Sequence, residues 1–218
     1  MSEKSQPIES IHDALLLDGN AKNLTDYYAR WAAHYNSDLV GNYVGPAVMV
    51  KLLVDSLADC FDPAPKVQDL QVMDAGCGTG MLGTFLAEAG VKQLFGTDLS
   101  QEMVDEAHKL AIYESLLGGI DLTLPPRQEW LQSFDIVVCC GVFTLGHVEA
   151  KVMWELLKMC KPGGVLMVST RTAFYDNSDF QSVSDAIVDA KAASLMKLVR
   201  DAPYTADGDA HYWIYKIH

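Results

Sequence analysis

Hydrophobic and polar positions follow two different periods along the chain, and the change between them divides the sequence into two parts. Up to about residue 60, apolar side chains recur every three or four positions, as they do on one face of a helix. This spacing predicts three helices, over residues 8–16, 22–36 and 46–57. Gly19-Asn20 ends the first helix, and Pro46 opens the third, because proline suits the first helical turn.

After the linker Asp62–Pro65, short apolar runs alternate with helical patterns. Alternation of this kind is typical of a parallel sheet with helices on both faces. The predicted strands cover residues 70–74, 94–98, 115–118, 134–140 and 165–170, and the predicted helices cover 81–89, 101–111 and 149–159. We therefore expect an N-terminal helical extension over residues 1–65 and an α/β domain over residues 66–218.

The C-terminal part of the chain departs from this alternation. One more helix is predicted from residue 178 to about 193, followed by strands at 195–200 and 211–217. The short polar stretch Thr205–Asp209 joins the two strands, and so short a connection implies an antiparallel hairpin. The sheet is expected to end in a reversed strand, which an ordinary dinucleotide-binding fold lacks.

The turn after the first of these strands carries the strongest chemical signal. The strand ends in Asp74, and glycines follow at positions 76, 78 and 80. Glycine permits positive φ and has no Cβ, so the backbone of such a turn can approach a ligand closely. Gly76-x-Gly78-x-Gly80 fits the loop that contacts the methionine part of S-adenosylmethionine (SAM) in methyltransferases, whereas Gly78-x-Gly80-x-x-Gly83 fits the dinucleotide fingerprint. Asp74 favours SAM, because a carboxylate would repel a pyrophosphate but suits a sulfonium and an ammonium group.

Two further acids follow later strands at the same edge of the predicted sheet. Asp98 ends the second strand, where its carboxylate can accept from both ribose hydroxyls of an adenosine. Asp121-Leu122 follows the third strand, where the acid can accept from an adenine amino group. The alternatives are a charge that favours a helix start for Asp98 and an ordinary turn aspartate for Asp121.

The loop after the fourth strand leaves the same edge and carries a candidate base. Gly141 lets its backbone approach a ligand, and His147 has an ordinary pKa of about 6.5, which suits general-base chemistry. A pocket wall or a helix cap is the alternative role for His147. Tyr28, Trp31 and Tyr35 fall on one face of the second helix, where they either pack in the core or form a lid over the ligand.

With these residues, the sequence resembles the class I SAM-dependent methyltransferases. The resemblance covers residues 70–218 and rests on Met73–Gly80, Gly96–Ser100, Lys161–Gly164 and the C-terminal hairpin. Two segments are similar, more narrowly, to the methyltransferase-like proteins named after the Williams–Beuren syndrome region. These segments are Tyr28–Asp38 and Gly141–Val148.

The resemblance implies a fold, a cofactor and a set of contacts. The fold is α/β and Rossmann-like, with a seven-stranded, mostly parallel sheet, an antiparallel last strand and an N-terminal helical lid. The cofactor is SAM, and the product is S-adenosylhomocysteine. The implied cofactor-binding residues are Asp74, Gly76 and Gly78 for the methionine moiety, Gly141 for its amino group, Tyr28 and Tyr35 for its carboxylate, Asp98 for the ribose, and Leu99, Met103, Asp121 and Leu122 for the adenine.

The composition of the chain limits which partners and which cellular compartment we expect for the protein. The net charge of −13 argues against a nucleic-acid partner, which usually meets a basic face. No apolar stretch reaches the roughly 18 residues that would predict a membrane span, and the polar N-terminus predicts no secretory signal. The five cysteines are odd in number and lack metal-ligand spacing, so we expect reduced thiols, no metal site and a cytoplasmic location.

We therefore expect an enzyme that moves the SAM methyl group to an oxygen, nitrogen or sulfur nucleophile of a small molecule by in-line displacement. His147 and Tyr28 are the candidate catalytic residues, and the protein is expected to be a monomer or a homodimer. An NAD(P)-dependent oxidoreductase is one alternative, because it shares the fold and the overlapping glycines. A non-catalytic SAM-binding protein is the other.

Overall fold

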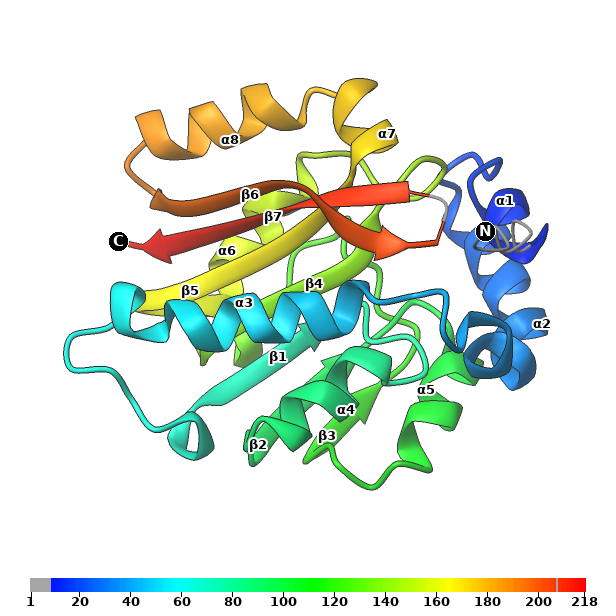
Figure 1. The fold of residues 1–218 in the computed structure, drawn as a ribbon, viewed down its shortest axis with the longest axis horizontal. Coiled ribbons are helices and arrows are strands. Elements are labelled where there is room, and N and C mark those ends of the chain that lie inside the picture. Colours follow the sequence, from blue (N-terminus) through cyan, green and yellow to red (C-terminus); the bar gives the residue numbers. More distant parts are fainter. Residues whose placement is uncertain (1–8, 207) are drawn as a thin grey trace, which may run out of the picture.

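A seven-stranded sheet forms the centre of the protein in a computed structural model that describes residues 9–206 and 208–218 (Figure 1). The strand order is β3-β2-β1-β4-β5-β7-β6. The strands are β1 (Gln71–Ala75), β2 (Gln93–Thr97), β3 (Ser115–Leu117), β4 (Phe134–Phe143), β5 (Cys160–Arg171), β6 (Ala193–Thr205) and β7 (Gly208–Ile217). Strands β1 to β5 pair in parallel, whereas β7 runs antiparallel to both β5 and β6. The predicted fold class, including the reversed strand in the C-terminal hairpin, is confirmed.

Helices cover both faces of the sheet, and each face has its own apolar core because parallel strands need burial on two sides. On one face lie α3 (Gly45–Cys60) and α4 (Met81–Glu88), and α5 (Gln101–His108) packs beside β3. On the other face lie α6 (Val152–Met159), α7 (Thr172–Asp176) and α8 (Phe180–Asp189). Two 3-10 turns, η1 (Val67–Asp69) and η2 (Gln128–Trp130), precede β1 and β4.

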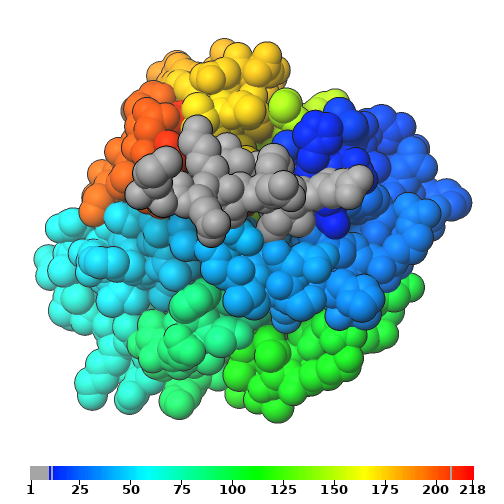
Figure 2. Space-filling model, turned by 45° about the vertical axis from the view of Figure 1, so that its right-hand side comes forward, coloured from blue at the N-terminus to red at the C-terminus, as the bar shows by residue number. Residues whose placement is uncertain are grey.

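The first two helices lie across the carboxyl ends of the parallel strands (Figure 1). They are α1 (Glu9–Ala14) and α2 (Ala21–Leu39), and in Figure 2 their blue surface borders the green surface of α5. Asn20 starts α2, because its side-chain oxygen accepts hydrogen bonds from the N–H groups of Lys22 and Asn23. Residues 1–8, to which the predicted first helix extends, lie outside the described part of the chain.

Four strands extend beyond their predicted bounds. β6 covers Ala193–Thr205 instead of 195–200, and β7 begins at Gly208 instead of 211, so the hairpin connection is shorter than predicted. β4 was expected to stop at Cys140 but continues to Phe143 through a register shift against β5, with Gly141 at φ +85°. This register shift lies at the carboxyl edge of the sheet, where the loop after β4 begins. β5 begins at Cys160, so the predicted turn Lys161–Gly164 is an irregular start of that strand.

Tyr113 explains why several glycines surround the first turn. A Cβ placed on Gly83 would stand 2.0 Å from the Tyr113 hydroxyl, and one on Gly96 would stand 2.8 Å from its ring. A Cβ on Gly80 would also stand 3.3 Å from the ring. The third glycine of the dinucleotide-like pattern therefore makes room for a tyrosine that packs against α4 and β2.

We predict that Gly83→Ala destabilises the protein by about 1–3 kcal/mol, because the added methyl group overpacks the Tyr113 ring. Helix propensity alone would predict the opposite sign, since alanine is favoured over glycine inside a helix by roughly 1 kcal/mol. Urea unfolding measures the difference. A variant as stable as the parent, or more stable, would show that Tyr113 does not constrain this position.

Candidate functional site

A cavity of about 390 Å³ opens at the carboxyl ends of the parallel strands, beneath α2. This volume lies in the range of sites for small molecules and cofactors. The predicted site residues that line it are Tyr28, Tyr35, Gly76, Gly78, Asp98, Leu99, Met103, Asp121, Leu122, Gly141 and His147. The structure therefore brings together all the predicted site residues except Asp74, and they come from the N-terminal helix and from four separate turns of the α/β part.

In the glycine turn after β1, the backbone can come close both to a ligand and to the loop after β4. Gly76 and Gly78 have φ values of +80° and +53°, a region that favours glycine. A Cβ on Gly76 would stand 2.4 Å from the Val142 side chain, so this glycine lets the loop after β4 close on the turn. A Cβ on Gly78 would meet no described atom within 4 Å, because this residue faces the cavity.

Asp98 joins that turn to the end of β2. Its Oδ2 accepts the Gly78 N–H at 2.8 Å, and its Oδ1 accepts the Ser100 N–H at 2.9 Å. Burial raises the pKa of the Asp98 carboxyl, while these backbone donors act against the rise. A carboxylate can accept about four hydrogen bonds, so each oxygen keeps capacity for a ligand hydroxyl.

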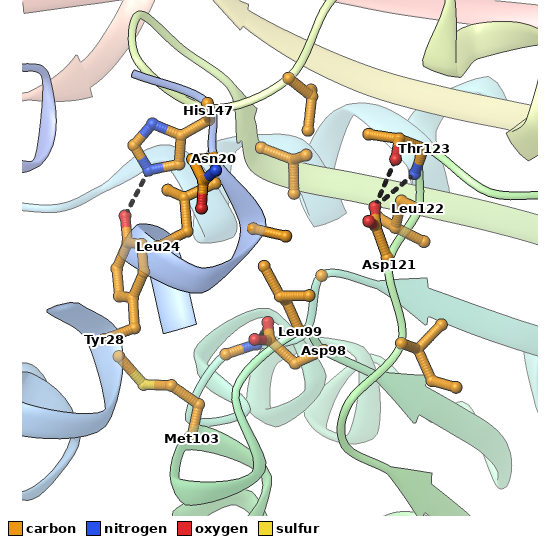
Figure 3. A pocket seen from close by; sticks show the side chains of 18 of the residues that line it. Asn20, Leu24, Tyr28, Asp98, Leu99, Met103, Asp121, Leu122, Thr123 and His147 are labelled. Atoms are coloured by element: carbon orange, nitrogen blue, oxygen red, sulfur yellow. Dashed lines mark hydrogen bonds between the residues drawn. The ribbon is translucent and has the colours of Figure 1, made fainter. Parts of the chain in front are cut away.

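The far wall of the cavity combines one oriented acid with apolar side chains (Figure 3). Asp121 Oδ1 accepts from both the backbone N–H and the hydroxyl of Thr123, at 2.8 and 2.6 Å. These two bonds fix the carboxylate at the rim of the cavity. Leu99, Leu122 and the buried Met103 supply apolar surface below it, which suits a flat base.

Asp74 lies behind the glycine turn instead of lining the cavity. It is only 1% exposed, and its Oδ2 accepts the Tyr113 hydroxyl at 2.8 Å. Its Oδ1 has no hydrogen-bond partner among the described residues. Burial raises the pKa of the Asp74 carboxyl to about 7, since no cation compensates for the lost water. A contact between Asp74 and the methionine moiety therefore stays a prediction. The sequence did not indicate that Tyr113 would be the hydrogen-bond partner of Asp74.

Tyr28 and His147 form a hydrogen-bonded pair at the opposite end of the cavity from Asp121 (Figure 3). The Tyr28 hydroxyl lies 2.6 Å from His147 Nε2, and His147 Nδ1 lies 2.9 Å from the Leu145 carbonyl oxygen. A carbonyl can only accept, so Nδ1 carries the ring proton and Nε2 accepts from Tyr28. Burial lowers the pKa of His147 and raises that of Tyr28, so both groups are neutral near pH 7.

A second, smaller cavity of about 60 Å³ shares Tyr28, Tyr35, Gly141 and His147 with the first. Two of its other residues are Tyr43, for which the sequence allows core packing or a place in the lid, and Tyr204, which was not predicted to belong to a site. Their hydroxyl oxygens lie 3.0 Å apart, and the Tyr43 hydroxyl lies 3.4 Å from Cys140 Sγ. Tyr204 comes from β6, so only the folded hairpin could reveal this cluster.

Comparisons with known proteins show which family the chain is similar to. A family model described as a methyltransferase domain matches residues 72–164. Methyltransferase-like protein 27 from Homo sapiens is 31% identical over 168 residues, which cover 75% of this chain and 63% of that protein. The ubiquinone biosynthesis O-methyltransferase of Azoarcus sp. (strain BH72) is 30% identical over 164 residues, 71% of this chain and 66% of that enzyme.

The chain belongs to the class I SAM-dependent methyltransferases. The predicted resemblance is confirmed, and SAM is the cofactor of the family. The chain spans less than two thirds of the length of the first curated relatives, 63% of methyltransferase-like protein 27 and 43% of a ubiquinone biosynthesis O-methyltransferase from Rickettsia bellii.

Solved structures share the fold of this methyltransferase chain. Magnesium protoporphyrin IX methyltransferase from Synechocystis, crystallised with SAM, superposes with a TM-score of 0.66 at 20% identity. That alignment covers 91% of this chain and 97% of the other. A TehB-like methyltransferase from Corynebacterium glutamicum gives a TM-score of 0.59 at 19% identity, over 91% and 100% of the two chains.

The described parts of this methyltransferase chain contain neither a helix that could span a membrane nor a cluster of metal-binding side chains. Within residues 9–206 and 208–218, no helix is long and apolar enough to span a bilayer. The same residues contain no group of three His, Cys, Asp or Glu side chains that could hold a metal ion. The five cysteines are buried, unpaired thiols.

We predict that Asp74→Asn raises the stability of the ligand-free protein above about pH 7 by roughly 1–3 kcal/mol. Between pH 3.8 and about 7 the unfolded chain has released the Asp74 proton and the folded chain has kept it. The free energy of unfolding of the parent therefore falls as the pH rises from 3.8 to about 7. Asp74→Asn removes this pH dependence, because asparagine does not ionise. Urea unfolding at about pH 5 and pH 8 measures it, with the exposed Asp105→Asn as control. Parallel pH curves for the parent and Asp74→Asn would contradict the assignment.

Proposed function

We propose that the protein transfers the methyl group of SAM to an oxygen, nitrogen or sulfur nucleophile of a small molecule. The observation that carries this proposal is the cavity itself. The residues predicted to bind the cofactor and the Tyr28–His147 pair line the same continuous space. A non-catalytic SAM-binding protein would need the first set of residues but not the second.

The residues of the cavity fit the chemistry of SAM. Asp98 retains acceptor capacity for two ribose hydroxyls, and Gly78 leaves space where a side chain would block a ligand. Asp121 is oriented to accept from an adenine amino group between apolar walls. The faces of Tyr28 and Tyr35 suit a positively charged sulfur, because aromatic rings attract cations. Gly141 presents its backbone toward the same region.

The protein's task in such a reaction is mainly to bind and align. SAM supplies a methyl group on a sulfonium, which is already a strong electrophile. The chain must hold the acceptor in line with that group and exclude water. Helix α2 helps to exclude water because it covers the cavity. The Thr79 hydroxyl in the glycine turn donates a hydrogen bond to the Asn36 side chain, which ties α2 to this turn. Residues 1–65 would act as the lid and specificity element, and residues 66–218 as the SAM-binding catalytic domain.

How much a general base adds to the rate depends on the chemistry of the methyl acceptor. A thiol or an amine needs little help near neutral pH, whereas a hydroxyl must lose a proton as it reacts. His147 is neutral, with its Nε2 lone pair directed to Tyr28, so this pair can take that proton. Several relatives are named for oxygen methylation, among them malonyl-[acyl-carrier protein] O-methyltransferase from Pectobacterium atrosepticum. A small-molecule acceptor, a cytoplasmic location, the absence of a nucleic-acid partner and a monomeric or homodimeric state stay predictions.

We predict that Asp98→Ala weakens binding of S-adenosylhomocysteine by about 1–3 kcal/mol, or roughly 5- to 150-fold, because hydrogen bonds to a charged group are lost. Isothermal titration calorimetry measures the affinity. The matched control is Asp105→Ala, which removes an exposed carboxylate from α5. An unchanged affinity in a folded Asp98→Ala variant would remove this residue from the ribose site.

We predict that His147→Ala lowers turnover about 100-fold with a hydroxyl acceptor, while the affinity for SAM changes much less. His34→Ala, on the exposed side of α2, is the matched control. Initial rates and calorimetry separate the two effects. Equal losses of rate and affinity would make His147 a structural residue of the cavity wall.

A further inference from the structure

The wall of the first cavity contains acids but no basic side chain. Asp98 and Asp121 face the cavity (Figure 3), whereas none of the described residues that line it is lysine or arginine. His147 also lines the cavity, but burial lowers its pKa, so it adds no charge near pH 7. The wall therefore favours a positively charged ligand over an uncharged ligand of the same shape.

Asp74 is a third acid, directly behind this wall. It stands two residues before Gly76, which lines the cavity, and it pairs in register with Gly96 of β2 and Val138 of β4. The side chain is buried, and its Oδ1 has no hydrogen-bond partner among the described residues. A carboxylate in such a place is costly, whereas a carboxyl group that keeps its proton is not.

The groups that face Asp74 provide it with one donor and no positive charge. The Tyr113 hydroxyl donates to Oδ2 and favours the ionised form, whereas the like charge of Asp98 disfavours it. Burial keeps the neighbouring thiols protonated by raising their pKa values, and these thiols belong to Cys77, Cys139 and Cys140. Among the described residues, Asp74 therefore has no cation that would stabilise its carboxylate.

The two forms of the cofactor differ in the charge that they would bring to Asp74. SAM carries a sulfonium, and loss of the methyl group converts it into the uncharged thioether of S-adenosylhomocysteine. Both compounds keep the same amino and carboxyl groups. Because opposite charges attract over longer distances inside a protein than in water, a sulfonium in the cavity stabilises the Asp74 carboxylate without touching it. The thioether does not.

We propose that Asp74 loses its proton when SAM binds and regains one after methyl transfer, so that this buried acid makes the site prefer SAM to S-adenosylhomocysteine. This inference rests on the proposed function. On binding, the O–H bond of the carboxyl group breaks and the proton passes to the solvent. After transfer the carboxylate has no cation beside it, and it takes a proton from the solvent. Asp74 is thus a residue that determines cofactor specificity and favours release of the product.

The proposal predicts a pH dependence that SAM shows more strongly than S-adenosylhomocysteine. Below about pH 7 the free protein holds the Asp74 proton, and SAM must expel it, so the affinity for SAM should rise up to that pH and level off above it. We expect the preference for SAM, measured as the ratio of the two dissociation constants, to rise about 5- to 10-fold between pH 6 and pH 7.5. Isothermal titration calorimetry measures both constants. A ratio that does not change with pH would overturn the proposal.

Asp74→Asn assigns this dependence to one residue. Asparagine does not ionise, and its side-chain oxygen can still accept from Tyr113. The preference of this variant for SAM should stay within about twofold over the same pH range. Asp105→Asn, which changes an exposed acid of α5, should behave like the parent. A folded Asp74→Asn variant with the pH dependence of the parent would show that another group carries it.

Proton release provides a readout that does not depend on affinity. Titrations of SAM at pH 6 in two buffers with different heats of protonation give the number of protons exchanged. We expect the parent to release close to one proton more per bound SAM than Asp74→Asn, because about nine tenths of the free protein holds the Asp74 proton at that pH. Equal proton release by the two proteins would contradict the proposal.

Tyr113→Phe tests the same residue without replacing it. The variant loses the hydroxyl that donates to Asp74 Oδ2 and favours the carboxylate. The pH at which the affinity for SAM levels off should therefore rise. An unchanged or lower pH would overturn the role of Asp74.

The outcomes separate the two proposals. A parent protein that binds neither SAM nor S-adenosylhomocysteine contradicts the proposed function. A parent that binds SAM and methylates an acceptor, but releases no more protons than Asp74→Asn, overturns the role of Asp74 alone.

Discussion

The hydrogen bond between the Gly78 N–H and Asp98 Oδ2 is the contact on which the shape of the site depends. It links the turn after β1 to the end of β2 and holds Gly78 at positive φ, with its Cα toward open space. The same carboxylate accepts from Ser100, whose side chain caps α5. One carboxylate in the wall of the cavity therefore positions two backbone segments, the turn after β1 and the start of α5.

Aromatic and polar side chains of α2 hold this helix over the cavity. Tyr28 reaches His147 across 119 residues of sequence, and Thr79 in the glycine turn reaches Asn36. The Gly19 N–H donates to the Gly146 carbonyl oxygen at 2.9 Å, beside the start of α2. The helix is thereby tied to both the glycine turn and the loop after β4. A cover held at several points shields the cavity from water.

Lack of space for a side chain, more than charge, explains the glycines behind the cavity. Tyr113 packs where Gly80, Gly83 and Gly96 lack side chains, and its hydroxyl is the hydrogen-bond partner of Asp74. Gly83, the third glycine of the dinucleotide-like pattern, is therefore explained here by the packing of a tyrosine, whereas Gly78 faces the cavity. The buried acid Asp74, which Tyr113 contacts, has no cationic partner among the residues that the structure describes, and burial raises its pKa.

The sequence by itself determined the order of elements, the parallel sheet with its reversed hairpin strand, and the edge at which ligand residues gather. Those features follow from local periodicity and from glycine and proline at turns, which act within a few residues. It also indicated eleven residues of the cavity wall. Those at the strand ends followed from the meeting of parallel strands at one edge, and others, such as Tyr35 and Met103, followed from the resemblance to methyltransferases. Tertiary structure alone decided that Asp74 turns toward Tyr113, that Tyr28 binds His147, and that Tyr43 and Tyr204 meet beside Gly141. These pairs join segments far apart in the chain, so only the packing of α2 and the hairpin against the sheet could bring them within hydrogen-bond distance.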